Sequence, residues 1–583
     1  MIEGYSKNKS IQILIALLKE HNIKRVIISP GTTNLEFVSG LQYEGSFKLY
    51  SSVDERSAAY MACGMATELN EPVVITCTEA TASRNYFSGL TEAYHRKLPI
   101  IAITGVHRYN RVDHLEPQTI DRSISPNDIF KLKVHLPIIK DKEDIWETEI
   151  KVNKALLEVN RHGGGPVHID LPCCNEDYDF STKVLPKVNV IKRYVLGDKL
   201  PDIPNGKIAI FIGSHRNFTI NETEILDKFC ATYNAIVICD HTSGYKGKYQ
   251  IKMARLSIQR AYYEIFSDVE LLIHMGEESG DGATMTRLRK VKRVWRVSPD
   301  GELRDTFKKL KNIFEMNEYD FLANYIKNDK NEKTYLLEMK NIVENIKTPI
   351  EKIPFSNIYV AAMLSSRIPE NSTIHLGVSN TIRAWSLFDF PKTVNSSSNV
   401  GCRGIDGALS SLVGASLINE KKLYFCVLGD LSFFYDMNAL GNRFIKNNIR
   451  ILLINNNGGG VFKLNGAPGH TFFGDEETNK FIAASGHFGN KSSILVKNYV
   501  ESLNFEYMCA TNKNDFEKVY RNFVNSNLTD KPIVFELFIN DSDDRLAFEI
   551  MSNIEVSTLG KTKKIAKNLL GRKGTNFIKN IIK

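Results

Sequence analysis

Short apolar runs alternate with longer amphipathic stretches along most of the chain. Residues 6–21 repeat apolar side chains at helical spacing, and the apolar run at 25–29 ends at a Pro-Gly turn. Strands and helices that alternate in this way are typical of parallel α/β domains. Further helices are predicted at 55–69 and 80–96. The apolar runs predict strands at 25–29, 73–77, 100–104, within 163–172, and at 207–212, 235–239, 271–275, 293–297, 372–376, 423–428, 449–454 and 533–539.

These strands fall into three groups along a chain of 583 residues, which is long enough for about three to five domains. A stretch rich in Lys, Asn and Glu at 328–348 resembles a connecting helix between the second and third groups. The sequence therefore predicts an α/β protein with three parallel-sheet domains and a short tail. The predicted boundaries are 1–185, 186–350, 351–555 and 556–583.

Composition narrows the class of protein. Hydrophobic residues make up 43% and charged residues 24% of the chain, as in ordinary globular proteins. The nine cysteines contain no CxxC pair, which favours reduced thiols in a cytoplasmic protein. The N-terminus lacks the pattern of a signal peptide, and no apolar stretch approaches the ~20 residues of a membrane span. We therefore expect a cytoplasmic location.

The net charge of +8 is concentrated in the tail. After Glu555 there are eight basic residues and no acidic ones, so the preceding residues are close to neutral. This balance gives no reason to expect binding to nucleic acid. Apolar residues between the basic ones leave two interpretations of the tail. It is either an amphipathic segment in peripheral contact with an anionic membrane, or a helix packed on the protein.

Candidate metal chemistry appears where two apolar runs end. Gly429 and Asp430 follow one run, and an Asn/Gly segment at 455–460 follows the next. The carboxyl ends of parallel strands meet at one edge of a sheet, where ligands bind in open α/β folds. A carboxylate, an amide oxygen and a carbonyl suit a hard divalent cation, and helix N–H groups after Asp430 would favour a phosphate.

A second candidate lies about 375 residues earlier. Val53-Asp-Glu55-Arg-Ser-Ala-Ala59 follows a predicted strand and opens a helix. A glutamate at a helix N-terminus is by itself either a capping or dipole residue or a catalytic one.

Together these segments resemble thiamine-diphosphate enzymes, and most closely the MenD family of synthases. The usual third residue of the metal motif is Gly, and Leu431 is a departure that MenD synthases share. The resemblance extends over most of the chain. It includes the segments Ile28-Ser-Pro-Gly31, Gly165–Pro172, Trp295–Gly301 and Gly404–Gly407, and Val461-Phe462.

The resemblance implies pyrimidine-binding, middle and diphosphate-binding domains that use thiamine diphosphate and Mg²⁺. It assigns the metal to Asp430, the Asn457 side chain and the Gly459 carbonyl. It makes Glu55 the catalytic partner of the aminopyrimidine N1′. Ile405 and Val461 are either an apolar support for the thiamine or plain core. The expected cofactor-binding residues are Glu55, Ile405, Asp430, Leu431, Ser432, Asn457, Gly459, Val461 and Phe462, and the expected assembly is a homodimer or homotetramer.

The substrate residues depart from the family. Its members hold substrate carboxylates with arginines, but Thr33, His107 and Val400 stand at three of those positions here. At the second of these, the arginine is either replaced by His107 or shifted by one place to Arg108. Arg403 appears three residues after Val400. A family serine is replaced by Glu79, with Arg84 nearby, and these two either pair or contact a polar substrate. The expected substrate residues are Thr32, Thr33, Glu79, His107, Arg108, Gln118, Arg383 and Arg403.

These residues favour decarboxylation of a 2-oxo acid with transfer of the acyl group to an acceptor, with altered substrate specificity. The alternative is the family's own reaction, which joins a succinyl group from 2-oxoglutarate to isochorismate. A catalytically silent scaffold is a further alternative, against which the presence of Glu55, Asp430 and Asn457 weighs.

Overall fold

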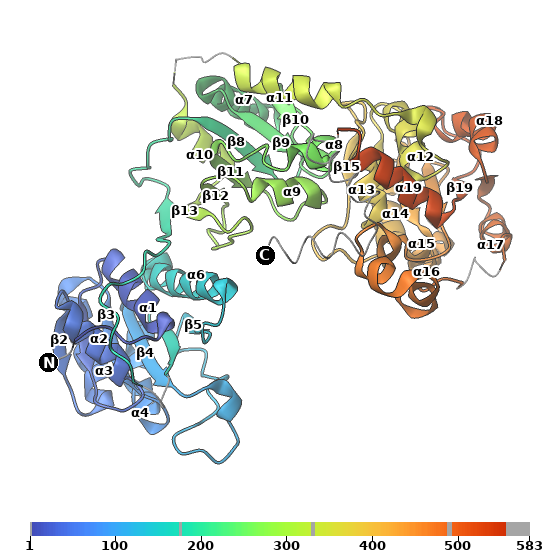
Figure 1. The fold of residues 1–583 in the computed structure, drawn as a ribbon. Coiled ribbons are helices and arrows are strands. Elements are labelled where there is room, and N and C mark those ends of the chain that lie inside the picture. The colour runs from blue at the N-terminus through green and yellow to red at the C-terminus, as the bar shows by residue number, and fades with distance from the viewer. Residues whose placement is uncertain (1–2, 174–177, 328–332, 487–491, 556–583) are drawn as a thin grey trace, which may run out of the picture. The chain divides into compact units, whose positions relative to one another are not determined.

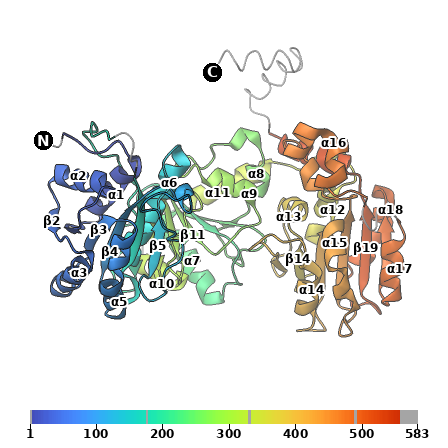
Figure 2. The same cartoon turned by 90° about the horizontal axis from the view of Figure 1, so that it is seen from below.

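The computed structural model describes residues 3–173, 178–327, 333–486 and 492–555. The basic tail, with its predicted membrane or packing helices, lies outside these residues. The chain forms two compact units, residues 1–199 with 300–315 and residues 200–299 with 316–583. Figures 1 and 2 show that both are built from parallel sheets covered by helices. No helix of the described residues is long and apolar enough to cross a membrane.

The first sheet has six parallel strands with helices on both faces. Helices α1, α2 and α6 enclose one apolar core, and α3, α4 and α5 enclose the other. The strand order is β2-β1-β3-β4-β6-β5. The strands are β1 (Arg25–Ile28), β2 (Lys48–Ser51), β3 (Val73–Thr78), β4 (Ile100–Val106), β5 (Leu132–His135) and β6 (Val167–Pro172). The helices are α1 (Lys9–Glu20), α2 (Leu35–Glu44), α3 (Glu55–Leu69), α4 (Thr81–Asn85), α5 (Phe87–His95) and α6 (Lys142–Glu158).

The second sheet has seven strands in the order β10-β9-β8-β11-β12-β13-β7. Its strands are β7 (Lys192–Val195), β8 (Lys207–Ile212), β9 (Ile236–Cys239), β10 (Gln250–Ile251), β11 (Val269–Met275), β12 (Val294–Val297) and β13 (Leu310–Glu315). The helices of this region are α7 (Ile220–Tyr233), α8 (Ala254–Ser257), α9 (Gly282–Leu288), α10 (Glu318–Tyr325) and α11 (Thr334–Asn345).

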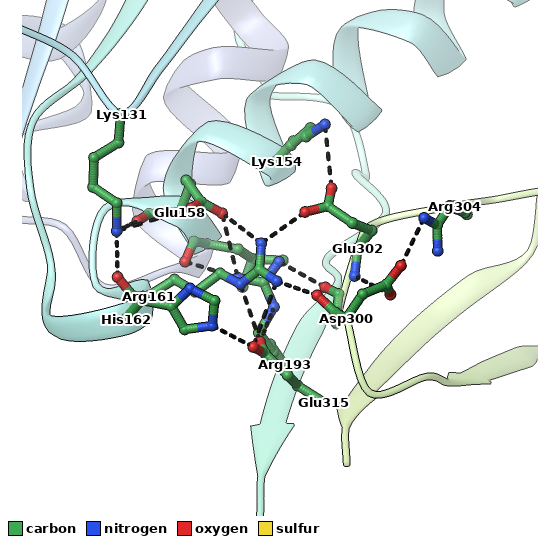
Figure 3. Close-up of polar contacts among 12 residues, drawn as sticks. Lys131, Lys154, Glu158, Arg161, His162, Arg193, Asp300, Glu302, Arg304 and Glu315 are labelled. Atoms are coloured by element: carbon green, nitrogen blue, oxygen red, sulfur yellow. Dashed lines mark hydrogen bonds and ion pairs between the residues drawn. The ribbon is translucent and has the colours of Figure 1, made fainter. Parts of the chain in front are cut away.

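A charged network holds β7 and β13 to the end of α6 (Figure 3). The Arg161 guanidinium is only 8% exposed, and it pairs with Glu158 at 3.2 Å, Glu302 at 2.9 Å and Glu315 at 3.1 Å. Arg193, on β7, approaches the same Glu315 carboxylate at 3.5 Å. Because these charges are mostly buried, removing one would leave its partners uncompensated.

The third sheet has six parallel strands in the order β15-β14-β16-β17-β19-β18. Helices α14, α15 and α17 pack on one face, and α12, α13, α18 and α19 on the other. The strands are β14 (Thr373–Leu376), β15 (Asn395–Ser397), β16 (Tyr424–Gly429), β17 (Ile449–Asn455), β18 (Glu506–Ala510) and β19 (Ile533–Phe538). The helices are α12 (Asn357–Leu364), α13 (Asn380–Trp385), α14 (Ala408–Ser416), α15 (Asp430–Asp436), α16 (Gly474–Glu477), α17 (Leu495–Ser502), α18 (Lys513–Phe523) and α19 (Asp541–Ser552).

The predicted fold class, α/β with three parallel sheets, is confirmed, and each predicted strand has a counterpart. The strand expected before Val53, for which no bounds were predicted, is β2. The sequence reading missed β5, β7, β10, β13, β15 and β18, of which all but β13 lie at a sheet edge. Edge strands are partly exposed, as in β2 and β7, so they lack the continuous apolar run of a central strand. The helical stretch predicted at 80–96 is confirmed, and it consists of two helices, α4 and α5, that are separated by Tyr86.

Candidate active site

A cavity of about 380 Å³ lies at the carboxyl edge of the third sheet. It is formed by the segments that follow β14, β16 and β17, together with the loop before α14. It brings together most of the residues predicted in this domain. The predicted residues that line it are Arg383, Arg403, Ile405, Asp430, Leu431, Ser432, Gly459, Val461 and Phe462.

Asp430 joins two of these segments. Its carboxylate is 2% exposed and accepts hydrogen bonds from the backbone N–H of Gly458 at 2.7 Å and of Leu431 at 2.8 Å. Asp430, at the end of β16, therefore holds the loop after β17 in place. This contact agrees with the prediction that the ends of these two neighbouring strands lie together. The Ser432 hydroxyl donates to the Ile405 carbonyl at 2.6 Å, which ties the loop before α14 to the same point.

The two other predicted metal ligands lie in the loop after β17. Asn457 has a φ of +65° and an exposed side chain, and the cavity wall contains its neighbours Asn456 and Gly458 rather than Asn457. The Gly459 carbonyl accepts the Phe462 N–H at 3.1 Å, which leaves one lone pair. Their ligand roles remain predictions.

The donor set of this cavity fits thiamine diphosphate with a divalent cation. The Asn380 amide nitrogen lines the cavity, is buried, and has no hydrogen-bond partner among the residues that the structure describes. A phosphate oxygen is the kind of acceptor it lacks. The described residues contain no group of three or more His, Cys, Asp or Glu that could hold a metal ion, so no all-protein metal cage competes with this assignment. One carboxylate completed by amide, carbonyl and diphosphate oxygens suits Mg²⁺.

Ile405 and Val461 were predicted either to support the thiamine or to belong to the core. Both are only partly buried, and both line the cavity. This position favours a role as an apolar wall for a ligand.

Two arginines lie at the cavity. Arg383 donates to the Asn380 side-chain oxygen at 3.4 Å. Arg403 lies 3.6 Å from a Glu278 carboxylate oxygen and donates to the Ser279 carbonyl at 3.2 Å. Burial, and then the charge of Arg403, lowers the pKa of Arg383. A guanidinium beside a second positive charge provides a place for an anionic substrate group.

In the first domain, Glu55 is the first residue of α3. The cap of this helix is Asp54, whose carboxylate accepts the Arg56 N–H at 3.1 Å. The half-buried Glu55 carboxylate instead accepts a hydrogen bond from the Asn85 amide at 3.1 Å. The structure thus assigns capping to Asp54, and the Glu55 carboxylate is held in position from α4.

Glu79 and His107 meet at a second cavity, of about 410 Å³, at the carboxyl edge of the first sheet. The Glu79 carboxylate is 3% exposed, accepts the His107 backbone N–H at 2.9 Å, and also contacts His107 Nδ1. The Glu79–Arg84 pair considered from the sequence is not formed. Arg84 donates to the Asp121 carbonyl at 3.1 Å, and its guanidinium lies over the Phe87 ring.

The sequence reading missed basic residues in the wall of this second cavity. Arg122 donates to Asp170 through Nε at 3.1 Å and Nη2 at 2.7 Å, and Lys133 lies 3.4 Å from the same carboxylate. Burial raises the pKa of Asp170, but its contacts with His168, His135, Arg122 and Lys133 outweigh this and leave the pKa lowered. The sequence offered a signal for His168 and Asp170, because both belong to the family-like segment Gly165–Pro172. It offered none for Arg122, which lies in no motif.

The other predicted substrate residues do not line this cavity. The buried Thr33 hydroxyl donates to the Gly105 carbonyl at 2.7 Å and lies 2.5 Å from the Thr78 hydroxyl. Its hydrogen-bonding capacity is therefore used inside the first domain. The remaining residues are exposed: Thr32, Arg108 and Gln118.

The fold and the cavity around Asp430 define a thiamine-diphosphate-dependent enzyme. In agreement, residues 9–124 match the family described as "Thiamine pyrophosphate enzyme, N-terminal TPP binding domain". The chain is also similar to curated proteins named 2-succinyl-5-enolpyruvyl-6-hydroxy-3-cyclohexene-1-carboxylate synthase. It is 30% identical over 555 residues to that of Bacteroides fragilis, covering 93% of this chain and 98% of the relative. It is 31% identical over 561 residues to that of Bacteroides thetaiotaomicron, covering 93% and 97%.

The chain therefore belongs to this synthase family, the MenD family. It is a decarboxylating carboligase of 2-oxo acids that uses thiamine diphosphate with a divalent metal, normally Mg²⁺.

Proposed function

We propose that this protein decarboxylates a 2-oxo acid and joins the acyl group to an acceptor that differs from isochorismate. The observation that supports this proposal is the buried Glu79 carboxylate beside His107. The family has a serine and an arginine at these positions. A carboxylate in the cavity wall repels a carboxylate substrate, whereas an arginine would bind it.

The expected size of this effect is large. Losing a buried arginine–carboxylate contact costs about 2–5 kcal/mol. A free energy of this size corresponds to a loss of about 30-fold to several thousandfold in affinity. The acceptor site is therefore better suited to a polar or neutral group than to a second carboxylate.

Each group at the site then has a role. When bound, thiamine diphosphate supplies the electron sink for loss of CO₂ from a 2-oxo acid. Glu55 would accept and share a proton with the aminopyrimidine N1′. Asp430 would be the one charged protein ligand of the metal and keeps the loop at Gly458 in place, and Ile405 and Val461 would exclude water from the reacting atoms.

Arg383 and Arg403 are suited to the carboxylate of the donor 2-oxo acid. Both lie in the wall of the cavity that contains Asp430, so a single ligand that fills this cavity would contact both guanidinium groups. A guanidinium matches a carboxylate with two parallel hydrogen bonds. We therefore place the donor acid here and the acceptor at Glu79 and His107.

The complete site requires two subunits in this proposal. Glu55 belongs to the proposed pyrimidine-binding domain (1–185) and Asp430 to the diphosphate-binding domain (351–555), with a middle domain (186–350) between them. In thiamine-diphosphate enzymes these two residues come from different subunits. A cytoplasmic homodimer or homotetramer with isologous contacts would satisfy this requirement.

A second candidate function is the reaction named by the curated relatives. Arg403 lies in the cavity wall beside Val400, so it could replace the arginine missing from position 400. Arg122 adds a guanidinium to the cavity that contains His107. These two placements favour retention of a dicarboxylate acceptor.

Purified protein with thiamine diphosphate and Mg²⁺ would decide between the two functions. The assay compares 2-oxoglutarate with other 2-oxo acids, each with and without isochorismate. We expect CO₂ release without efficient consumption of isochorismate, and a gain of isochorismate use in Glu79→Ser. Efficient consumption by the unmodified protein, unchanged in Glu79→Ser, would support the relatives' reaction instead.

A further inference from the structure

A third cavity, of about 410 Å³, shares no lining residue with the cavities that contain Asp430 and Glu79. Its walls come from the segment after β9, the residues around β10 and α8, helix α11, and the loop 386–396 after α13. All of them belong to the same compact unit of the chain. The cavity adjoins the carboxyl end of β9, which is the edge where open α/β sheets bind ligands.

The wall carries an excess of basic side chains. Five lysines and arginines line the cavity against three acids. One acid, Asp240, is already saturated by hydroxyl and backbone donors, among them the Ser279 hydroxyl at 2.5 Å and the Gly280 N–H at 2.9 Å. Another, Asp389, pairs with Lys252 at 3.1 Å. The basic residues are Lys246, Lys252, Arg255, Lys340 and Lys392.

Among the described residues, two of these cations have only neutral hydrogen-bond partners. Lys246 donates to the Val394 carbonyl at 2.9 Å and to the Asn395 side-chain oxygen at 2.8 Å. Arg255 donates to the carbonyls of Leu387 and Ile346, each at 3.3 Å. Among the residues that the structure describes, neither forms a salt bridge. Burial, and then the charges of Lys422 and Lys252, lower the pKa of Lys246.

A buried hydroxyl in the same wall also has no partner. Ser386 follows α13 and is 7% exposed, and its Oγ has no hydrogen-bond partner among the described residues. This hydroxyl therefore has hydrogen-bonding capacity that a ligand group in the cavity could use. It lines the cavity together with the cations.

Part of the wall is aromatic. The Phe390 ring lies 4.2 Å from the His241 ring, centroid to centroid. Burial and Lys252 lower the pKa of His241 to about 3, so the ring is neutral. It accepts from Lys252 at 3.3 Å and donates to the Trp385 carbonyl at 2.9 Å. The Lys252 ammonium also lies 5.9 Å from the centre of the Phe390 ring. Aromatic rings beside a cation suit a flat apolar group that carries a negative charge.

We propose that this cavity is a binding site for a small organic anion, separate from the active site. Its phosphate or carboxylate group binds Lys246, Arg255 and the Ser386 hydroxyl. Its flat apolar part packs against Phe390 and His241. The site requires neither the metal nor the substrates of the decarboxylation, and it does not depend on the function proposed above.

Titration calorimetry on the full-length protein, saturated with thiamine diphosphate and Mg²⁺, tests this site. The probes are phenyl phosphate, inorganic phosphate and phenol. We expect one phenyl phosphate per chain, clearly weaker binding of inorganic phosphate, and no binding of phenol. Equal affinities for phenyl phosphate and inorganic phosphate would overturn the role of the aromatic wall.

Substitutions then locate the bound probe. Lys246→Met and Lys340→Glu should each raise the Kd of phenyl phosphate by about tenfold, and Lys248→Met, a neighbouring lysine outside the cavity, should not. Lys340 lies on α11 without a salt bridge among the described residues, so its variant tests the site even if Lys246→Met folds poorly. Arg383→Ala should leave the Kd unchanged. Loss of binding in Arg383→Ala, or an unchanged Kd in both lysine variants, would refute the site.

Discussion

Replacing Asp430 by asparagine separates its role at the metal from its role in the fold. The carboxylate now accepts two backbone N–H groups, from Gly458 at 2.7 Å and Leu431 at 2.8 Å. An asparagine offers one oxygen and one NH₂ group, so one N–H would face another donor. Leaving that buried donor unsatisfied costs about 1–3 kcal/mol of stability. In addition, the loss of the only charged protein ligand should weaken the binding of the metal by about 2–5 kcal/mol.

The chain offers a matched control on the same helix. Asp436 ends α15, is 7% exposed, and accepts the Ser410 N–H at 2.7 Å, but it does not line the cavity. Asp436→Asn should therefore lower the thermal midpoint of the cofactor-free protein about as much as Asp430→Asn. Only Asp430→Asn should weaken Mg²⁺-dependent cofactor binding, by about 30-fold to several thousandfold.

Calorimetric titration with thiamine diphosphate, with Mg²⁺ and with EDTA, measures this difference. Thermal melting of the cofactor-free variants measures the effect of each substitution on the stability of the fold. If Asp430→Asn binds the cofactor with the wild-type Mg²⁺ dependence, or if Asp436→Asn loses as much affinity, the metal assignment is wrong.

Four further predictions follow from the proposed site. Glu55→Gln should retain the fold and most cofactor binding but slow proton–deuterium exchange at the thiamine C2 by orders of magnitude; a wild-type exchange rate would contradict its role. When inactive Glu55→Gln and Asp430→Ala chains are mixed, some activity should return, because one site of the hybrid dimer is intact. Full activity in a protein that sedimentation shows to be a monomer would exclude a site shared between subunits. With 2-oxoglutarate and isochorismate, kcat/KM should stay below about 10⁴ M⁻¹ s⁻¹, a value typical of good enzymes. Arg383→Ala should raise the KM for the donor acid with a smaller change in kcat, and an unchanged KM would place the donor elsewhere.

The central strands could be predicted because burial on both faces leaves a nearly continuous apolar run. Strands such as β3, β4 and β17 are buried along almost their whole length, and each was predicted. The edge strands were not, since β15 has only three residues and none is buried. A strand with one partner and an exposed side carries no comparable pattern.

The site around Asp430 was predictable for a similar reason. Two apolar runs ended in polar residues, and parallel topology places such ends together. The partner of Glu79 was not predictable in this way. Arg84 is close in sequence but points away, whereas His107 follows the next strand and lies beside the carboxylate. Asp170 and Arg122 are 48 residues apart, and only the folded sheet shows that they pair.

The identical strand order of the first and third sheets puts two acidic residues at matching places. Each order reads second, first, third, fourth, sixth, fifth strand. Glu79 follows the third strand of the first sheet, and Asp430 follows the third strand of the third sheet. One topology therefore presents a carboxylate at the same edge of two sheets, where one is the predicted metal ligand and the other is paired with His107.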